Sequence, residues 1–219
     1  MAKRMKIDEL NILRSDEPAE YEEAFDRQDY IEHYFDVMQI SEKQKKERIE
    51  EAEELFDAIL LFFIWCEENP ENVQTPDTQR DMQNLYKEVV FQHVEPSEFI
   101  DIYVPLFIST LIEVTVKYPD DPYYTSVERA TNVACNEANT ISNYSELKAA
   151  KEAGYTYKQW RTELDEKVRP THQEMEGITI PIDEPFIVGT SYMMMPHDMT
   201  LGASAEEIVN CRCSMTFTD

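Results

Sequence analysis

The chain has 219 residues and a formal net charge of −25, from 45 acidic and 20 basic residues. This length suits one large domain or two small ones and is enough to bury a core. A surface so negative repels phosphate, which argues against direct nucleic-acid binding as the main role. A hydrophobic content of 42% argues against a chain that is merely solvated.

The N-terminal residues lack the apolar core of a signal peptide. The most apolar run, AILLFFIWC at 58–66, is about half the length needed to cross a bilayer. We therefore expect a cytosolic protein with no membrane contact. Its four cysteines, Cys66, Cys135, Cys211 and Cys213, are expected to be reduced and not to form disulfides.

The front of the chain reads as helical, because all four glycines follow residue 153. YIEHYFDVMQI at 30–40 suits a short amphipathic arm that docks on a surface. A longer helix is predicted from the N-cap Ser41 to just before Pro70. Its core face is predicted to contain Ile49, Ala52, Phe56, Ile59 and Phe63.

Two more helices are predicted over 77–94, with Met82, Leu85 and Val89 inward, and over 96–118. Pro105 should kink or divide the second of these. KYPDDPYY at 117–124 is rich in turn formers. We therefore place a domain boundary there, between an acidic helical region of residues 1–120 and a second domain of residues 121–219.

The second domain is expected to open with a capping box formed by Thr125 and Glu128. The helix that follows should end at Gly154, and its many Ala, Asn, Thr and Ser residues favour close backbone packing. The remaining residues alternate between short strands and short helices. The fold class is therefore α+β: a mainly helical N-terminal region followed by a small α+β domain.

In that C-terminal part, residues 155–162 alternate as a strand, with Lys158 and Trp160 on one side. Residues 165–176 are predicted to form a short helix ended by Gly177. Asp165 and Arg169 would then pair on one helical face. A strand is predicted over 178–186, a second capping box at Ser204, and a closing strand over 211–217.

This arrangement resembles the phage Mu F-like head morphogenesis domain of minor capsid proteins, over roughly residues 125–216. The resemblance is carried by an ordered set of positions in the segments NEANTISN, YKQWRTELDEKVRPTHQEMEGITIPIDEPF and MPHDMTLGASAEEIVNCRC. The matching residues are Glu137, Asn143, Trp160, Asp165, Arg169, His172, Gly177, Phe186, Pro196, Asp198, Ala205, Asn210, Cys211 and Cys213.

The resemblance implies a non-enzymatic minor head protein that associates with the portal and other phage head proteins. Such a protein is made in the host cytoplasm, enters the head interior, assembles there in oligomeric structures, and supports head assembly or DNA delivery. The acidic helical region is expected to contact the portal or other head proteins. The alternative is an enzyme of ADP-ribosyltransferase type or a prophage-encoded toxin, although the sequence offers no convincing set of catalytic residues.

His172, Cys211 and Cys213 also suggest a structural zinc site, because thiolate and imidazole are typical zinc ligands. A fourth ligand could be His197, Asp198 or water. The simpler interpretation is that these side chains are buried and hydrogen-bonded without a metal or any other cofactor. Both interpretations remain open from the sequence.

Overall fold

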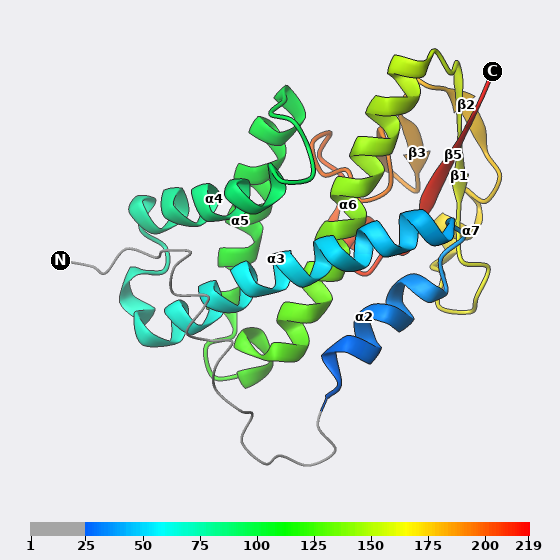
Figure 1. Cartoon of the computed structure of the whole chain (residues 1–219). Coiled ribbons are helices and arrows are strands. Elements are labelled where there is room, and N and C mark those ends of the chain that lie inside the picture. Colours follow the sequence, from blue (N-terminus) through cyan, green and yellow to red (C-terminus); the bar gives the residue numbers. More distant parts are fainter. Residues whose placement is uncertain (1–24) are drawn as a thin grey trace. The chain divides into compact units, whose positions relative to one another are not determined.

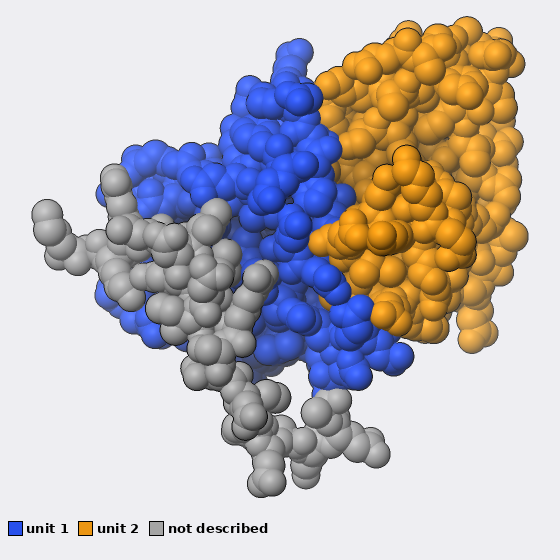
Figure 2. All heavy atoms as spheres, in the orientation of Figure 1, with its two compact units in different colours: residues 1–30, 51–134 blue, residues 31–50, 135–219 orange. Residues whose placement is uncertain are grey.

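In a computed structural model that describes residues 25–219, helices dominate up to residue 153, and short antiparallel strands with two short helices follow (Figure 1). The predicted α+β class is confirmed. The chain divides into two compact units, coloured separately in Figure 2. Of the described residues, unit 1 contains 25–30 and 51–134, and unit 2 contains 31–50 and 135–219. The domain boundary at residue 120 stays a prediction.

The helical elements, in chain order, are α2 Arg27–Asp36, α3 Glu42–Glu68, η2 Pro70–Asn72, α4 Pro76–Val90, α5 Glu98–Lys117, η3 Pro122–Thr125, α6 Val127–Ala153, α7 Pro170–Gln173 and α8 Ala205–Ile208. The strands are β1 Tyr157–Arg161, β2 Thr179–Pro181, β3 Phe186–Val188, β4 Ser191–Met193 and β5 Ser214–Thr218.

Helix α3 confirms the helix predicted from Ser41 to just before Pro70. Ser41 and Gln44 form a capping box, in which the Gln44 N–H donates to Ser41 Oγ at 3.3 Å and the Ser41 N–H donates to Gln44 Oε1 at 2.9 Å. Of the predicted core face, Ala52, Phe56, Ile59 and Phe63 are buried. Ile49 is half-buried. The amphipathic pattern before α3 likewise forms helix α2, with Ile31, Tyr34 and Phe35 buried.

Unit 1 is built from α4, α5 and the parts of α3 and α6 that belong to it. The inward residues predicted for α4 are all buried: Met82, Leu85 and Val89. Pro105 does not divide α5, which runs without a break from Glu98 to Lys117. The proline removes the bond to the carbonyl of Asp101. Because Asp101 is exposed, water can take that bond.

By length and composition alone α5 would be able to cross a membrane, although 44% of its most apolar window is buried in the protein. Buried residues such as Val104, Ile108 and Leu111 are those of a core helix. A buried core helix satisfies the same length and hydropathy criteria as a membrane span. The length and composition of α5 are therefore weak evidence for a membrane span.

Helix α6 begins one residue later than predicted. The Arg129 N–H donates to Ser126 Oγ at 3.1 Å, so Ser126 is the capping residue. Thr125 ends η3 and donates its hydroxyl to Glu67, so the predicted Thr125–Glu128 capping box is wrong. The other end is as predicted, because Gly154 follows α6 with a φ of +88°.

In unit 2, β1 lies between β2 and β5 in an antiparallel sheet, and β3 pairs with β4. The predicted alternation of β1 is confirmed, with Lys158 and Trp160 buried. Trp160 lies opposite Met215 in the register. The closing strand is shorter than predicted: β5 starts at Ser214, so Cys211 and Cys213 lie in the segment that leads into it.

Candidate functional site

The side chains of His172, Cys211 and Cys213 come together in unit 2. His172 lies on α7, and the cysteines lie in the segment between α8 and β5. His172 Nδ1 is 3.5 Å from Cys211 Sγ and 3.4 Å from Cys213 Sγ. All three residues are at most 3% exposed. The predicted grouping of these three residues is therefore present, in a buried cluster.

Two backbone conformations position the segments that carry the cluster, one before α7 and one before the cysteines. Pro170 is the first residue of α7, and the residue before a proline is pushed out of the helical region. Arg169 accordingly has an extended conformation, with φ −65° and ψ 150°. Asn210 adopts a φ of +56°, which asparagine tolerates better than most residues, and so turns the chain from α8 into the cysteine segment.

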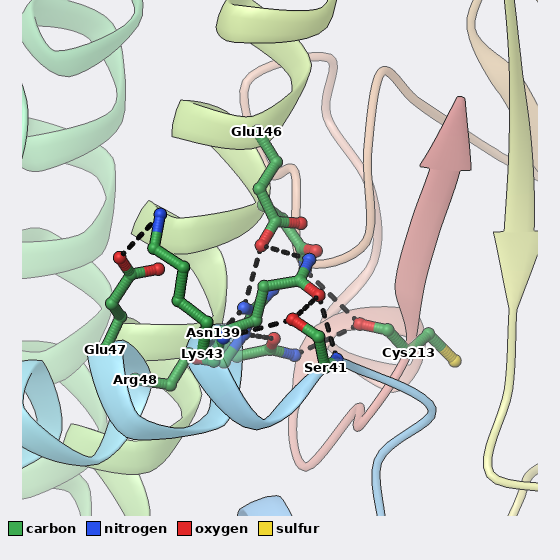
Figure 3. A network of polar contacts seen from close by, with 9 residues as sticks. Ser41, Lys43, Glu47, Arg48, Asn139, Glu146 and Cys213 are labelled. Atoms are coloured by element: carbon green, nitrogen blue, oxygen red, sulfur yellow. Dashed lines mark hydrogen bonds and ion pairs between the residues drawn. The ribbon is translucent and has the colours of Figure 1, made fainter. Parts of the chain in front are cut away.

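Three asparagines at steps of three and four on α6 bind the chain that leads into β5, two through its backbone and one through the Asn210 side chain. Asn139 Nδ2 donates to the carbonyl of Cys213 at 3.1 Å, and Asn143 Nδ2 donates to the same oxygen at 3.3 Å. Asn136 Nδ2 donates to Asn210 Oδ1 at 3.3 Å. Figure 3 shows the Cys213 carbonyl facing Asn139 and its sulfur on the opposite side. Asn139 and Asn143 therefore hold the backbone of Cys213, while its thiol stays directed at His172.

The first turns of α3 support this asparagine row. Arg48, which is 1% exposed, donates from Nε to Asn139 Oδ1 at 3.1 Å. Its Nη1 forms an ion pair with Glu146 at 2.8 Å, and Gln44 donates to the same carboxylate at 2.9 Å (Figure 3). A buried guanidinium needs such a partner, and here the pair also orients the amide of Asn139.

Two more side chains hold the Cys211 carbonyl. Tyr34 donates its hydroxyl to that oxygen at 3.2 Å, and His197 Nε2 contacts it closely. His197 and Asp198 lie outside the cluster whose ligand atoms are within 4.8 Å of one another, so neither lies in the fourth position considered from the sequence. Asp198 instead accepts from the backbone N–H groups of Met194 and Thr200.

The predicted Asp165–Arg169 pair is wrong. Residues 165–169 are not helical, so a spacing of four does not bring the two side chains together. Asp165 instead pairs with Arg212 at 2.7 Å. Arg169 donates to the backbone carbonyls of Glu206 and Val209. Both residues therefore fasten the loop before α7 to the segment around α8.

The remaining motif residues have structural surroundings. Trp160 packs edge-on against His172, with ring centroids 5.5 Å apart. Glu137 is 5% exposed on α6. Gly177 has a φ of +74° and donates its N–H to the Trp160 carbonyl. Of these residues, Trp160 packs directly against the cluster, through His172.

The buried thiols differ in acidity. Burial opposes ionisation of Cys211, but the hydrogen bond from Cys213, the charge of His197 and the hydrogen bonds of the two histidines outweigh it and hold the pKa of Cys211 well below its usual range. The hydrogen bond to Cys211 and burial hold the pKa of Cys213 well above its usual range. Proximity of two acidic groups thus favours the loss of only one proton from the pair.

Two acidic residues beside the cluster were not identified from the sequence. Glu207 Oε2 lies 3.0 Å from His172 Nε2 and accepts the Thr171 hydroxyl at 2.8 Å. Glu163 lines a cavity of about 20 Å³ together with the three cluster residues. Neither of its buried carboxylate oxygens has a hydrogen bond among residues 25–219 that meets normal geometry. Burial raises the pKa of Glu163 to about 8, against the lowering effects of the Arg212 charge and the Gln39 backbone N–H.

Residues 109–216 match the family described as Phage Mu protein F like protein. A curated relative, an NAD(+)–arginine ADP-ribosyltransferase EFV of Enterococcus faecalis (strain ATCC 700802 / V583), is 32% identical over 93 residues, which is 41% of this chain. This chain spans only 18% of that relative's length. No solved structure matches the chain.

Proposed function

Residues 109–216 form a phage Mu F-like domain, and from this premise we propose that the chain is a non-enzymatic minor head protein that binds the portal. The family supports a role in phage head morphogenesis. In this proposed role the chain joins the portal during assembly in the host cytoplasm. It then stays in the head interior and supports head assembly or DNA delivery. The ordered match over residues 109–216 is the observation that carries it.

The surroundings of the motif residues favour a structural role for the domain. His172 and both thiols are nearly inaccessible, and the cavity beside them has a volume of about 20 Å³. A cavity of that size accommodates about one water molecule. A substrate therefore has no access to these groups in this conformation, whereas buried hydrogen bonds are what a stable assembly module needs.

The charge of the chain favours protein partners. A net charge of −25 is repelled by packaged DNA, so contacts with other proteins must hold the chain inside a head. Copurification tests this directly: the full-length chain is co-expressed with the portal protein of the same genetic element and the complex is separated by size. We expect the chain to elute with the portal ring.

A wash at high salt distinguishes a specific portal contact from nonspecific electrostatic binding. At 1 M salt the screening length falls to about 3 Å, so adhesion between exposed charges is lost. We expect the portal complex to survive that wash, with an unrelated acidic protein of similar size as the control. A chain that remains separate from the portal at low and at high salt contradicts portal binding.

The second candidate is the activity named for the Enterococcus relative. That likeness covers 18% of the relative, so more than four fifths of that protein lies outside it. The test is release of nicotinamide from NAD by purified chain, compared with heat-denatured chain. We expect no difference between the two. Sustained release by the native chain alone would make the enzyme the better proposal.

A further inference from the structure

We propose that His172, Cys211 and Cys213 bind a single structural zinc ion. Tetrahedral zinc has bonds of about 2.0 Å to nitrogen and about 2.3 Å to sulfur, which separates a nitrogen from a sulfur ligand by about 3.5 Å. His172 Nδ1 lies 3.5 Å and 3.4 Å from the two sulfur atoms. The two nitrogen–sulfur separations therefore already match those of a zinc site, and all three ligand atoms lie within 4.8 Å of one another.

The opposite side of the imidazole supports the same assignment. His172 Nε2 faces Glu207, whose carboxylate is also held by the Thr171 hydroxyl. Zinc-bound histidines commonly donate their second ring N–H to a carboxylate in this way. The 3.0 Å contact is not aligned as a hydrogen bond, since Nε2 has no partner of good geometry among the described residues. Ligation through Nδ1 selects the tautomer with its hydrogen on Nε2, which is the form that donates to Glu207.

The cavity beside the cluster provides the fourth position. It is lined by the three ligands and Glu163, and its volume of about 20 Å³ admits one water molecule. Glu163 lies outside the group of mutually close ligand atoms, so it is not placed to bind the ion directly. A zinc-bound water that donates to Glu163 fills the fourth coordination site and gives a buried carboxylate a well-aligned hydrogen bond, which neither of its oxygens has from residues 25–219.

The charges of such a site balance. Two thiolates neutralise Zn²⁺, and the imidazole is neutral. The ion would tie α7 to the segment before β5, across 39 residues of chain between His172 and Cys211. Since the unfolded chain does not assemble these ligands, binding adds to folding stability.

The site is tested on the full-length chain, expressed in zinc-containing medium and purified without added metal. We expect about one zinc per chain by elemental analysis, and a tetrahedral spectrum with thiolate-to-metal charge transfer after exchange into Co²⁺. Cys66→Ser and Cys135→Ser are matched controls, because those cysteines are buried but outside the cluster. They should bind metal as the wild type does.

Two variants distinguish the roles of the residues. Cys211→Ser removes a ligand and should abolish the charge-transfer spectrum of a two-thiolate site. Glu207→Gln keeps all three ligands and should lower zinc affinity by about 10- to 100-fold while the stoichiometry at saturating zinc stays the same. If Cys211→Ser does not fold, the wild-type spectrum and the Glu207→Gln titration decide. Negligible zinc together with no tetrahedral Co²⁺ spectrum in the folded wild type overturns the proposal.

Discussion

Replacement of Asn139 by alanine tests how the cysteine segment is held in place. The change removes the amide that donates to the Cys213 carbonyl and accepts from Arg48 Nε. The carbonyl keeps its bond from Asn143, but the buried Arg48 Nε loses its partner. An unpaired buried polar group costs about 1–3 kcal/mol, and more when the group is charged. We therefore expect the free energy of unfolding to fall by about 3 kcal/mol.

For a chain of this length, that loss corresponds to a fall in Tm of about 6–12 °C. Urea unfolding followed by near-UV and far-UV circular dichroism measures it, and coincident transitions justify a two-state treatment. Asn84→Ala is the matched control, because Asn84 is an exposed asparagine within α4. It should stabilise the chain by up to about 0.7 kcal/mol, since alanine is the better helix former.

A double-mutant cycle with Arg48→Met isolates the contact between the two side chains. When both partners are removed, no unpaired Nε remains, so the double variant should lose about 1–2 kcal/mol less than the sum of the single losses. The reasoning is refuted if Asn139→Ala costs less than about 1 kcal/mol, or if the two substitutions are additive.

A Cβ at Gly189 would lie 2.8 Å from Glu207 Oε1 at a φ of +58°, whereas one at Gly154 meets nothing within 4 Å at a φ of +88°. Thermal unfolding should therefore show Gly154→Ala losing about 1–2 kcal/mol from backbone strain. Gly189→Ala should lose clearly more, and equal losses would contradict the close approach. Lys158 is fully buried and donates to the Met194 carbonyl at 2.6 Å. Burial, the largest effect, lowers its pKa from 10.5 to about 8. Between pH 8 and pH 10.5 the unfolded chain binds more protons at Lys158 than the folded chain does, so folding stability rises with pH. The destabilising effect of Lys158 is therefore full below pH 8 and fades as the pH rises. We expect the stability of Lys158→Met relative to the wild type to decline by about 2 kcal/mol from pH 7 to pH 10 in urea titrations, after allowance for partial solvent screening. A difference that does not change with pH would show that the Lys158 pKa is not lowered.

Much of the helical architecture is readable from local signals. Ser41, the apolar positions of α3 and α4, and Gly154 act within a turn or two of their own positions, so spacing alone predicts them. The pairing of Asp165 with Arg169 failed because it assumed a helix across Pro170. The proline forces Arg169 out of the helical region, and this restriction was itself available in the sequence.

Other parts of the site depend on contacts that spacing cannot supply. Asp165 reaches Arg212 across 47 residues, and Arg48 reaches Asn139 across 91. Glu207 looked like the second member of a capping box with Ser204, yet its carboxylate turns to Thr171 and His172. The three asparagines at steps of three and four on α6 were the one readable sign of the network. Buried polar side chains are hydrogen-bonded, so such a stripe predicts that the helix face binds polar groups of neighbouring segments.

The composition of unit 2 affects how an N-terminal deletion would be interpreted. Residues 31–50 belong to unit 2, and Tyr34 and Arg48 within them hold the cysteine segment and the asparagine row. Deletion of residues 1–120 would therefore remove internal partners of the Mu F-like domain as well as any portal-binding surface. Intact chains with point substitutions are the better material for assembly experiments.

The most direct test of the head-protein account is the amount of this chain in purified heads. Heads are assembled from the complete set of head genes of the same element, washed at high salt, and analysed by quantitative mass spectrometry against the portal protein. The account predicts that the chain is retained in a fixed ratio to the portal. Complete, DNA-filled heads that lack the chain, although it is expressed in the same cells, would contradict it.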